Sequence, residues 1–166
     1  MAPWQERHNI RLREYDYNTP GAYFLTLCVE NRKCVLSRIV GTGVLDGPSI
    51  ELLLYGKIAA KYIDQLNDFY DNLSVECYVI MPNHIHILLR VLEGPSRTPV
   101  PTIQNSAVSR FVSTFKRFCN KEYGQNIWQS RSYDHVIRDQ ADFDRQLQYI
   151  YENPFGWAKD ELFVDE

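Results

Sequence analysis

The stretch Tyr78-Val-Ile-Met-Pro-Asn-His84-Ile-His86-Ile-Leu-Leu-Arg90 predicts two β-strands separated by a bend at Pro82-Asn83. Successive side chains of a strand point to opposite faces. His84 and His86 therefore share one face of the second strand, and the apolar residues that alternate with them occupy the other face. The apolar face would anchor this strand in a core. The opposite face would present two imidazole nitrogens side by side.

The spacing of this histidine pair leaves two interpretations open. The pair could be two polar residues on the solvent face of an antiparallel strand, or it could form a metal or phosphate site. The chain contains four histidines in all. Because a His-hydrophobic-His triplet is too short to be specific, other parts of the sequence have to distinguish the two.

Composition predicts one globular domain. The chain has 166 residues, of which 45% are hydrophobic and 13% aromatic, which is enough to bury a core. No apolar run is long enough to cross a membrane, and the N-terminal residues lack the apolar stretch of a signal peptide. We therefore expect a cytoplasmic protein without a membrane partner. The four cysteines form no C-x-x-C pair and are expected to be reduced.

The formal net charge of −3 and the sequence pI of about 5.8 argue against non-specific binding to duplex DNA, which is typical of basic proteins. Cations are nevertheless unevenly distributed. Arg110, Lys116, Arg117 and Lys121 lie on one predicted helix, where a solvated face is the simpler interpretation.

The order of predicted elements indicates the α+β class. We expect an N-terminal arm over residues 1–20 and a Pro-rich loop over 93–101, both within a single domain spanning 1–166. Strands are predicted at 23–30, within 34–44, at 74–81, at 84–91 and within 126–138. Helices are predicted at 50–66 after an N-cap at Ser49, from Thr102 or Ser106 to 123, and at 141–152 after Asp139 or Gln140. Asn153-Pro154 is expected to end the last helix. Such an order favours an antiparallel sheet covered by helices, and a ferredoxin-like arrangement would place the histidine strand centrally.

The last predicted helix carries a second pair of interest. Tyr149 and Asn153 are four residues apart and therefore share one helix face. The phenolic oxygen could serve as a nucleophile, and the amide oxygen could join two imidazoles at a metal. In a chain with eleven tyrosines, packing is the simpler interpretation of Tyr149 alone. Tyr151 is a competitor, about 200° around the helix from Tyr149 and away from Asn153.

Four motifs in order resemble the HUH single-tyrosine transposases, and more narrowly their REP-associated branch. They are the 78–86 stretch, Ile127-Trp128-Gln129, Tyr133-Asp134-His135-Val-Ile-Arg138 and Tyr149-Ile-Tyr-Glu-Asn153-Pro154. The resemblance runs from about residue 23 to 157. It implies a ferredoxin-like antiparallel sheet covered by helices, with His84 and His86 as the metal pair, Asn153 as the third ligand and Tyr149 as the nucleophile.

The implied activity is cleavage and rejoining of single-stranded hairpin DNA through a 5′-phosphotyrosine, with Mg²⁺ or Mn²⁺ as cofactor. Arg110, Lys116, Arg117 and Arg138 are candidate phosphate contacts. Trp128 is a candidate for stacking on an unpaired base. A core or solvent-facing position is the simpler interpretation of each of these residues taken singly. His135 is expected to bond the backbone near the last strand. A homodimer is possible, and the protein would associate with the nucleoid when bound to DNA. Two alternatives remain open, namely a catalytically silent binder of DNA hairpins and a metal hydrolase that uses water as its nucleophile.

Overall fold

A four-stranded antiparallel sheet in the order β4-β5-β1-β6 organises the molecule. The computed structural model describes residues 15–41, 47–93 and 106–164. The strands of this sheet are β1 (Gly21–Cys28), β4 (Leu73–Ile80), β5 (His84–Val91) and β6 (Tyr133–Val136). The histidine strand β5 lies between β4 and β1, as the ferredoxin-like prediction requires.

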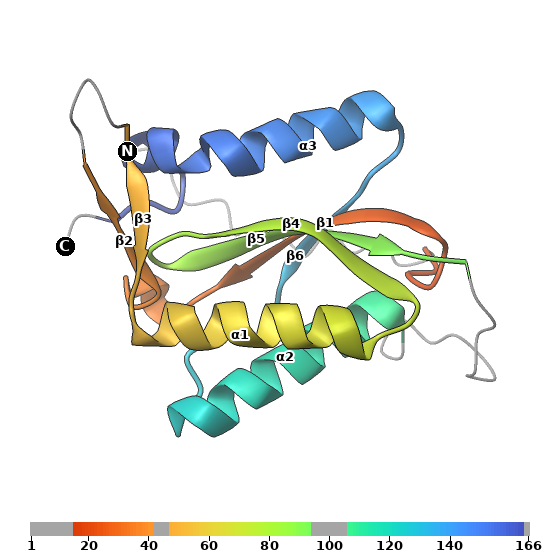
Figure 1. Ribbon diagram of the computed structural model, residues 1–166, viewed down its shortest axis with the longest axis horizontal. Helices are drawn as coiled ribbons and strands as arrows, with labels where there is room; N and C mark the ends of the chain where they lie inside the picture. Colours follow the sequence, from red (N-terminus) through yellow and green to blue (C-terminus); the bar gives the residue numbers. More distant parts are fainter. Residues whose placement is uncertain (1–14, 42–46, 94–105, 165–166) are drawn as a thin grey trace.

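Helices cover both faces of this sheet (Figure 1). They are α1 (Leu54–Phe69), α2 (Ala107–Tyr123) and α3 (Gln140–Glu152), with short 3₁₀ helices η1 (Glu30–Arg32) and η3 (Asn153–Lys159). Helices α1 and α2 lie together on one face, and α3 lies on the other. The predicted α+β class, an antiparallel sheet covered by helices, is confirmed. None of the helices among the described residues is long and apolar enough to span a membrane.

The strand pattern explains why β5 is buried on both faces. Ile85, Ile87 and Leu89 pack into the larger core, to which α1 and α2 contribute. Leu88 faces the opposite side, where it packs with Phe24 and with Ile150 of α3. The predicted anchoring of β5 by its apolar face is confirmed. The histidine face is also buried, so the interpretation of His84 and His86 as solvent-facing residues is wrong.

One predicted helix start differs from the structure. Ser49 begins a strand rather than capping a helix, because Ser49–Leu52 (β3) pairs with Ser37–Val40 (β2) in a separate two-stranded sheet. The alternation of half-buried and exposed residues in β3 fits a strand, and α1 begins after Leu53 with no side-chain cap. At the other end of the chain α3 ends at Glu152 as predicted, although Asn153 keeps helical dihedral angles before Pro154. Pro154 lies in the first turn of η3, where its missing N–H is not needed.

The remaining helix ends follow the sequence. Ser106 caps α2 by accepting a hydrogen bond from the Ser109 backbone, and Gly124 ends it in the left-handed conformation. Asp139 caps α3 by accepting from the Asp142 backbone. None of the four cysteines, all of which lie in the described ranges, forms a disulfide. The alternative cap at Thr102, most of the N-terminal arm and most of the Pro-rich loop lie outside the described residues.

Candidate functional site

The two histidines of β5 meet through their Nε2 atoms, which lie 3.0 Å apart. His84 is fully buried and His86 is 4% exposed. Their remaining ring nitrogens are also engaged, since His84 Nδ1 contacts Asn83 Oδ1 at 2.8 Å and His86 Nδ1 contacts Thr26 Oγ1 at 2.9 Å. Ligand atoms on adjacent corners of an octahedral ion lie about 3 Å apart. The spacing of the two Nε2 atoms therefore fits a pair that binds one cation.

Burial sets the protonation state of His84. Removal from water lowers its pKa to about 4, although the nearby carboxylate of Asp160 raises the pKa and Arg32 lowers it. The imidazole is therefore neutral near pH 7. A neutral imidazole is the form that binds a metal ion.

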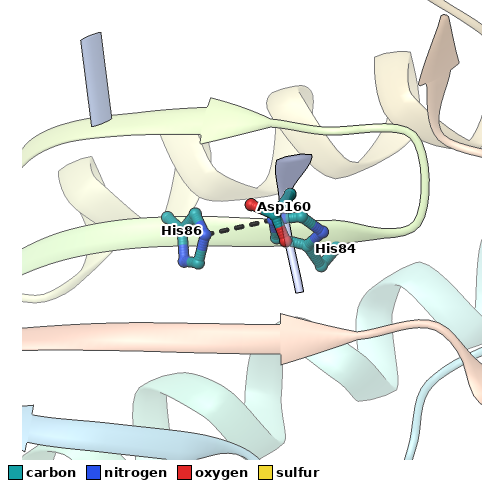
Figure 2. Close-up of side chains that lie close together, drawn as sticks. All are labelled: His84, His86 and Asp160. Carbon is teal, nitrogen blue, oxygen red and sulfur yellow. Dashed lines mark hydrogen bonds between the residues drawn. The ribbon is translucent and has the colours of Figure 1, made fainter. Parts of the chain in front are cut away.

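Asp160 joins the histidine pair from a distant part of the chain. Its carboxylate and the ring nitrogens of His84 and His86 all lie within 4.8 Å of one another. Figure 2 shows Asp160 beside the two imidazoles. Asp160 Oδ1 accepts a hydrogen bond from the Leu162 backbone at 2.7 Å, which holds the carboxylate in place. This group of two nitrogen donors and one carboxylate could hold a divalent metal ion.

Asn153 lies beside Asp160 at the start of η3. Its Nδ2 contacts Asp160 Oδ2 at 3.4 Å, and the residue is 5% exposed. Asn153 Oδ1 is buried and has no hydrogen-bond partner within the described parts of the chain. A buried carbonyl oxygen without a partner is an available ligand for a cation. The donor set therefore fits a divalent metal ion, while the predicted role of Asn153 as a ligand stays a prediction.

Tyr149 lies over the same region from α3. The centroid of its ring is 5.2 Å from that of His86 and 6.0 Å from that of Phe24. Tyr149 is also 43% exposed, so solvent reaches part of this side chain. Tyr151 is 66% exposed, and it is the ring of Tyr149 that contacts His86. The structure thus brings His84, His86, Tyr149 and Asn153 together.

The predicted DNA contacts on α2 lie elsewhere. Helix α2 covers the face of the sheet opposite to α3, so Arg110, Lys116 and Arg117 are on the other layer from Tyr149 (Figure 1). Lys116 Nζ donates to the backbone carbonyls of Gln129 and Arg131 at 2.7 and 3.4 Å. Arg110 Nε is buried, and Arg117 is exposed beside Phe118.

Trp128 is a core residue. It is 1% exposed and packs against Phe115 of α2, with ring centroids 5.4 Å apart. The prediction that Trp128 stacks on a base is wrong, because its ring faces the protein interior. The large indole ring packs against the apolar face of α2. A tryptophan after a helix can pack in the core or stack on a base, and the sequence alone does not distinguish the two.

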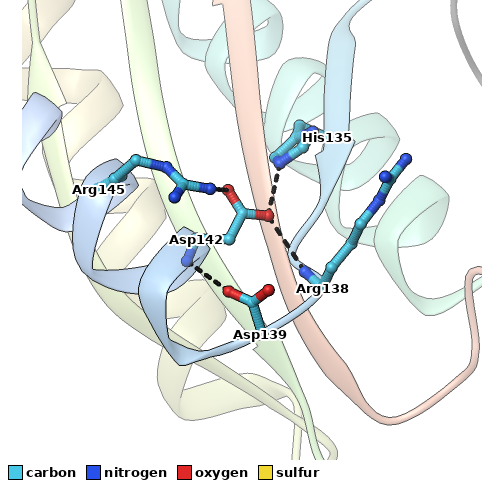
Figure 3. Close-up of polar contacts among 5 residues, drawn as sticks. All are labelled: His135, Arg138, Asp139, Asp142 and Arg145. Atoms are coloured by element: carbon cyan, nitrogen blue, oxygen red, sulfur yellow. Dashed lines mark hydrogen bonds and ion pairs between the residues drawn. The ribbon is translucent and has the colours of Figure 1, made fainter.

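His135 and Arg138 belong to a polar network at the start of α3, centred on Asp142 (Figure 3). His135 Nε2 lies 2.8 Å from Asp142 Oδ2, so His135 bonds a carboxylate rather than the expected backbone. The Arg138 backbone N–H also donates to Asp142 Oδ2, at 3.1 Å, and the exposed side chain of Arg138 points away from Asp142. Arg145 pairs with Asp142 Oδ1 at 3.3 Å. Burial raises the pKa of Asp142, but the hydrogen bonds from His135 and the Arg138 backbone outweigh it and hold that pKa below its ordinary value.

Sequence reasoning missed Asp160, Asn83 and Thr26. Asp160 is separated from Asn153 by the turn of η3, so helical spacing does not align the two residues. The register of β1 against β5 pairs Thr26 with His86. Thr26 could have been noticed as a polar residue within the apolar run of β1. Asn83 was visible only as a turn residue.

Comparisons with known proteins bear on this site. No protein-family model matches the chain. An uncharacterised protein from Haemophilus influenzae is 28% identical in an alignment 176 residues long. The alignment covers 96% of this chain and 94% of that protein. A REP-associated tyrosine transposase from Escherichia coli is 31% identical over 88 residues, which cover 52% of this chain and 48% of that protein.

The fold is similar to that of a solved structure. A REP-associated tyrosine transposase bound to a REP hairpin matches this structure with a TM-score of 0.60 and 21% identity. The match covers 96% of this chain and 77% of that one. The chain is therefore a relative of the REP-associated tyrosine transposases and has their fold.

Proposed function

We propose that this protein is a metal-dependent transposase that cleaves and rejoins single-stranded hairpin DNA through a 5′-phosphotyrosine on Tyr149. The observation that carries the proposal is the position of Tyr149. Its ring packs against that of His86, with ring centroids 5.2 Å apart, and the residue is 43% exposed. A nucleophile that is open to a strand and lies beside a convergent ligand set is the arrangement that such chemistry requires.

The ligand set consists of His84 and His86 with oxygen donors from Asp160 and Asn153, and Mg²⁺ or Mn²⁺ is the expected ion. When bound, the ion would polarise the scissile phosphate and stabilise charge on its oxygens. Burial keeps His84 neutral, and the Leu162 backbone orients the Asp160 carboxylate. These residues would thus hold the ion, and the ion would hold a phosphate near Tyr149.

Tyr149 Oη attacks phosphorus in line with the departing 3′ oxygen. An oxygen–phosphorus bond forms to the tyrosine, which gives up its phenolic proton to solvent. The phosphorus–O3′ bond breaks, O3′ takes up a proton from solvent, and the strand leaves with a free 3′-OH. Attack by another 3′-OH reverses these steps and joins two strands. Because one phosphodiester is exchanged for another, no external energy source is needed.

Hairpin DNA is the proposed substrate because a solved relative of the same fold is described as bound to a REP hairpin. Arg138 is the predicted phosphate contact best placed to assist, since it is exposed next to the start of α3. Arg110, Lys116 and Arg117 of α2 lie on the opposite face of the sheet from Tyr149. They could contact only DNA that extends from Tyr149 around the edge of the sheet. Because the formal net charge is −3, we expect DNA to be bound by a few local cationic side chains rather than by a basic surface over the whole protein.

A denaturing gel tests the proposal. Purified protein is incubated with Mn²⁺ and labelled single-stranded hairpins taken from the flanks of its own gene. We expect a heat-stable protein–DNA band that is absent with Tyr149→Phe and with EDTA. Tyr151→Phe is the matched control and should retain the band. Binding without a band in the wild type would contradict the proposal and favour the silent hairpin binder, and cleavage that persists in Tyr149→Phe would favour a hydrolase.

A further inference from the structure

The hydrogen-bond partners of His84 determine which of its ring nitrogens carries the proton. Asn83 Nδ2 donates to the backbone carbonyls of Arg32 at 3.3 Å and Leu162 at 2.8 Å. Asn83 Oδ1, which can only accept, therefore faces His84 Nδ1. His84 Nδ1 carries the proton, and because a neutral imidazole has one N–H, His84 Nε2 presents a lone pair.

His86 has the opposite tautomer in this arrangement. The two Nε2 atoms are 3.0 Å apart, and since His84 Nε2 has no proton, His86 Nε2 is the donor. His86 Nδ1 is then an acceptor, and the Thr26 hydroxyl donates to it at 2.9 Å. Thr26 is 5% exposed and lies opposite His86 in the register of β1 and β5. The hydroxyl therefore makes its contact with His86 in the interior of the protein.

Binding of a cation by both Nε2 atoms requires a change in His86. The ring must lose its proton at Nε2 and gain one at Nδ1, with no change in net charge. The new Nδ1–H then needs an acceptor in a buried place. The Thr26 hydroxyl can supply one by rotation, since it can accept a hydrogen bond as readily as donate one.

We propose that Thr26 is a positioning residue that lets His86 change tautomer when a divalent cation binds. The inference rests on the metal site of the proposed function and concerns the chain's own residues toward that ion. A partner for the second ring nitrogen fixes the tautomer and orientation of a metal-binding histidine. His84 needs no such change, because Asn83 holds it in the binding tautomer already.

Nuclear magnetic resonance of the full chain, labelled with ¹⁵N at histidine, tests the tautomers directly. Without metal we expect His84 to be protonated at Nδ1 and His86 at Nε2. With saturating Mg²⁺, which is diamagnetic, we expect both rings to be protonated at Nδ1. The proposal is overturned if His86 is protonated at Nδ1 without metal, or if it stays protonated at Nε2 with Mg²⁺.

Metal affinity tests the role of the hydroxyl. Calorimetric titration with Mn²⁺ should show an affinity for Thr26→Val about 10-fold or more below that of the wild type, because valine keeps the shape but can neither donate nor accept. Thr26→Ser should restore binding. Thr114→Val is the matched control, since Thr114 bonds the Tyr70 hydroxyl on the other layer. Wild-type affinity in Thr26→Val, or failure of Thr26→Ser to bind, would overturn the proposal.

The same variants separate this inference from the proposed function. If the wild type and Thr26→Ser bind Mn²⁺ but form no covalent adduct with hairpin DNA, the proposed function fails and the role of Thr26 stands. If the wild type binds neither Mn²⁺ nor Mg²⁺, the role of Thr26 is overturned. A third outcome is that the wild type forms adducts although His86 keeps its tautomer when metal is added. The proposed function would then stand, and the proposed role of Thr26 would be overturned.

Discussion

At the scale of single residues, burial explains most of the chemistry of the site. His84 is fully buried, and removal from water lowers its pKa to about 4. Asn153 and Asp160 supply the oxygen atoms nearby, and one of them, Asn153 Oδ1, is an acceptor without a partner within the described ranges. A metal ion would satisfy that oxygen and the lone pair of a neutral imidazole together.

The lowered pKa of His84 predicts a pH dependence of stability. Between pH 6.5 and about 4 the unfolded chain binds a proton at this position and the folded chain does not. The free energy of unfolding of the metal-free protein should therefore fall as the pH is lowered through this window, by up to about 3 kcal/mol from this group. Urea denaturation at several pH values checks this. His84→Gln should lose this part of the slope, and an unchanged slope would show that His84 is not the group responsible.

At the scale of elements, the close approach of α1 to the chain before β2 depends on a glycine. A Cβ at Gly56 would lie 2.0 Å from the Leu36 backbone oxygen. Gly56→Ala should therefore destabilise the protein, although alanine is the better helix former by about 1 kcal/mol. Gly156→Ala is the control, because a Cβ there meets nothing within 4 Å. Increased stability of Gly56→Ala in thermal denaturation would contradict this close approach.

The link between β6 and α3 depends on Asp142. Its carboxylate accepts from His135, the Arg138 backbone and Arg145. Asp142→Ala removes the shared acceptor of His135 and of the Arg138 backbone N–H, and we expect a loss of about 1–3 kcal/mol in the free energy of unfolding. The exposed Asp144 lies on the same helix, so Asp144→Ala is the matched control in urea denaturation. Equal stability of the two variants would remove Asp142 from this structural role.

Sequence patterns predicted the elements that have a clear period or a clear cap. The alternation in β5 and the stripe of α2 placed both elements correctly, and Asp139 capped α3 as its residue type suggests. The β3 strand was missed because Ser49 is a good N-cap residue, and pairing with β2 is a tertiary contact that local preference does not contain. Asp160 was missed for the same reason, since η3 brings it back to β5 without any regular spacing.

At the scale of the whole molecule, one chain contains all the residues of the proposed site. Tyr149 contacts His86 of its own chain, so cleavage should require both residues in the same molecule. A mixture of Tyr149→Phe and His86→Ala proteins should therefore form no covalent adduct with hairpin DNA. The denaturing gel described above checks this, with the wild type as the positive control. Adduct formation by the mixture would show that two chains exchange their α3 helices.

The central claim is that Tyr149 is the nucleophile, and the most direct test identifies the residue that carries the DNA. After incubation with hairpin DNA and Mn²⁺, the adduct is digested with nuclease and protease, and the peptides are sequenced by mass spectrometry. Our account predicts a phosphonucleotide on Tyr149 in the peptide that also contains Tyr151. A modification on Tyr151, or on a residue outside α3, would contradict it.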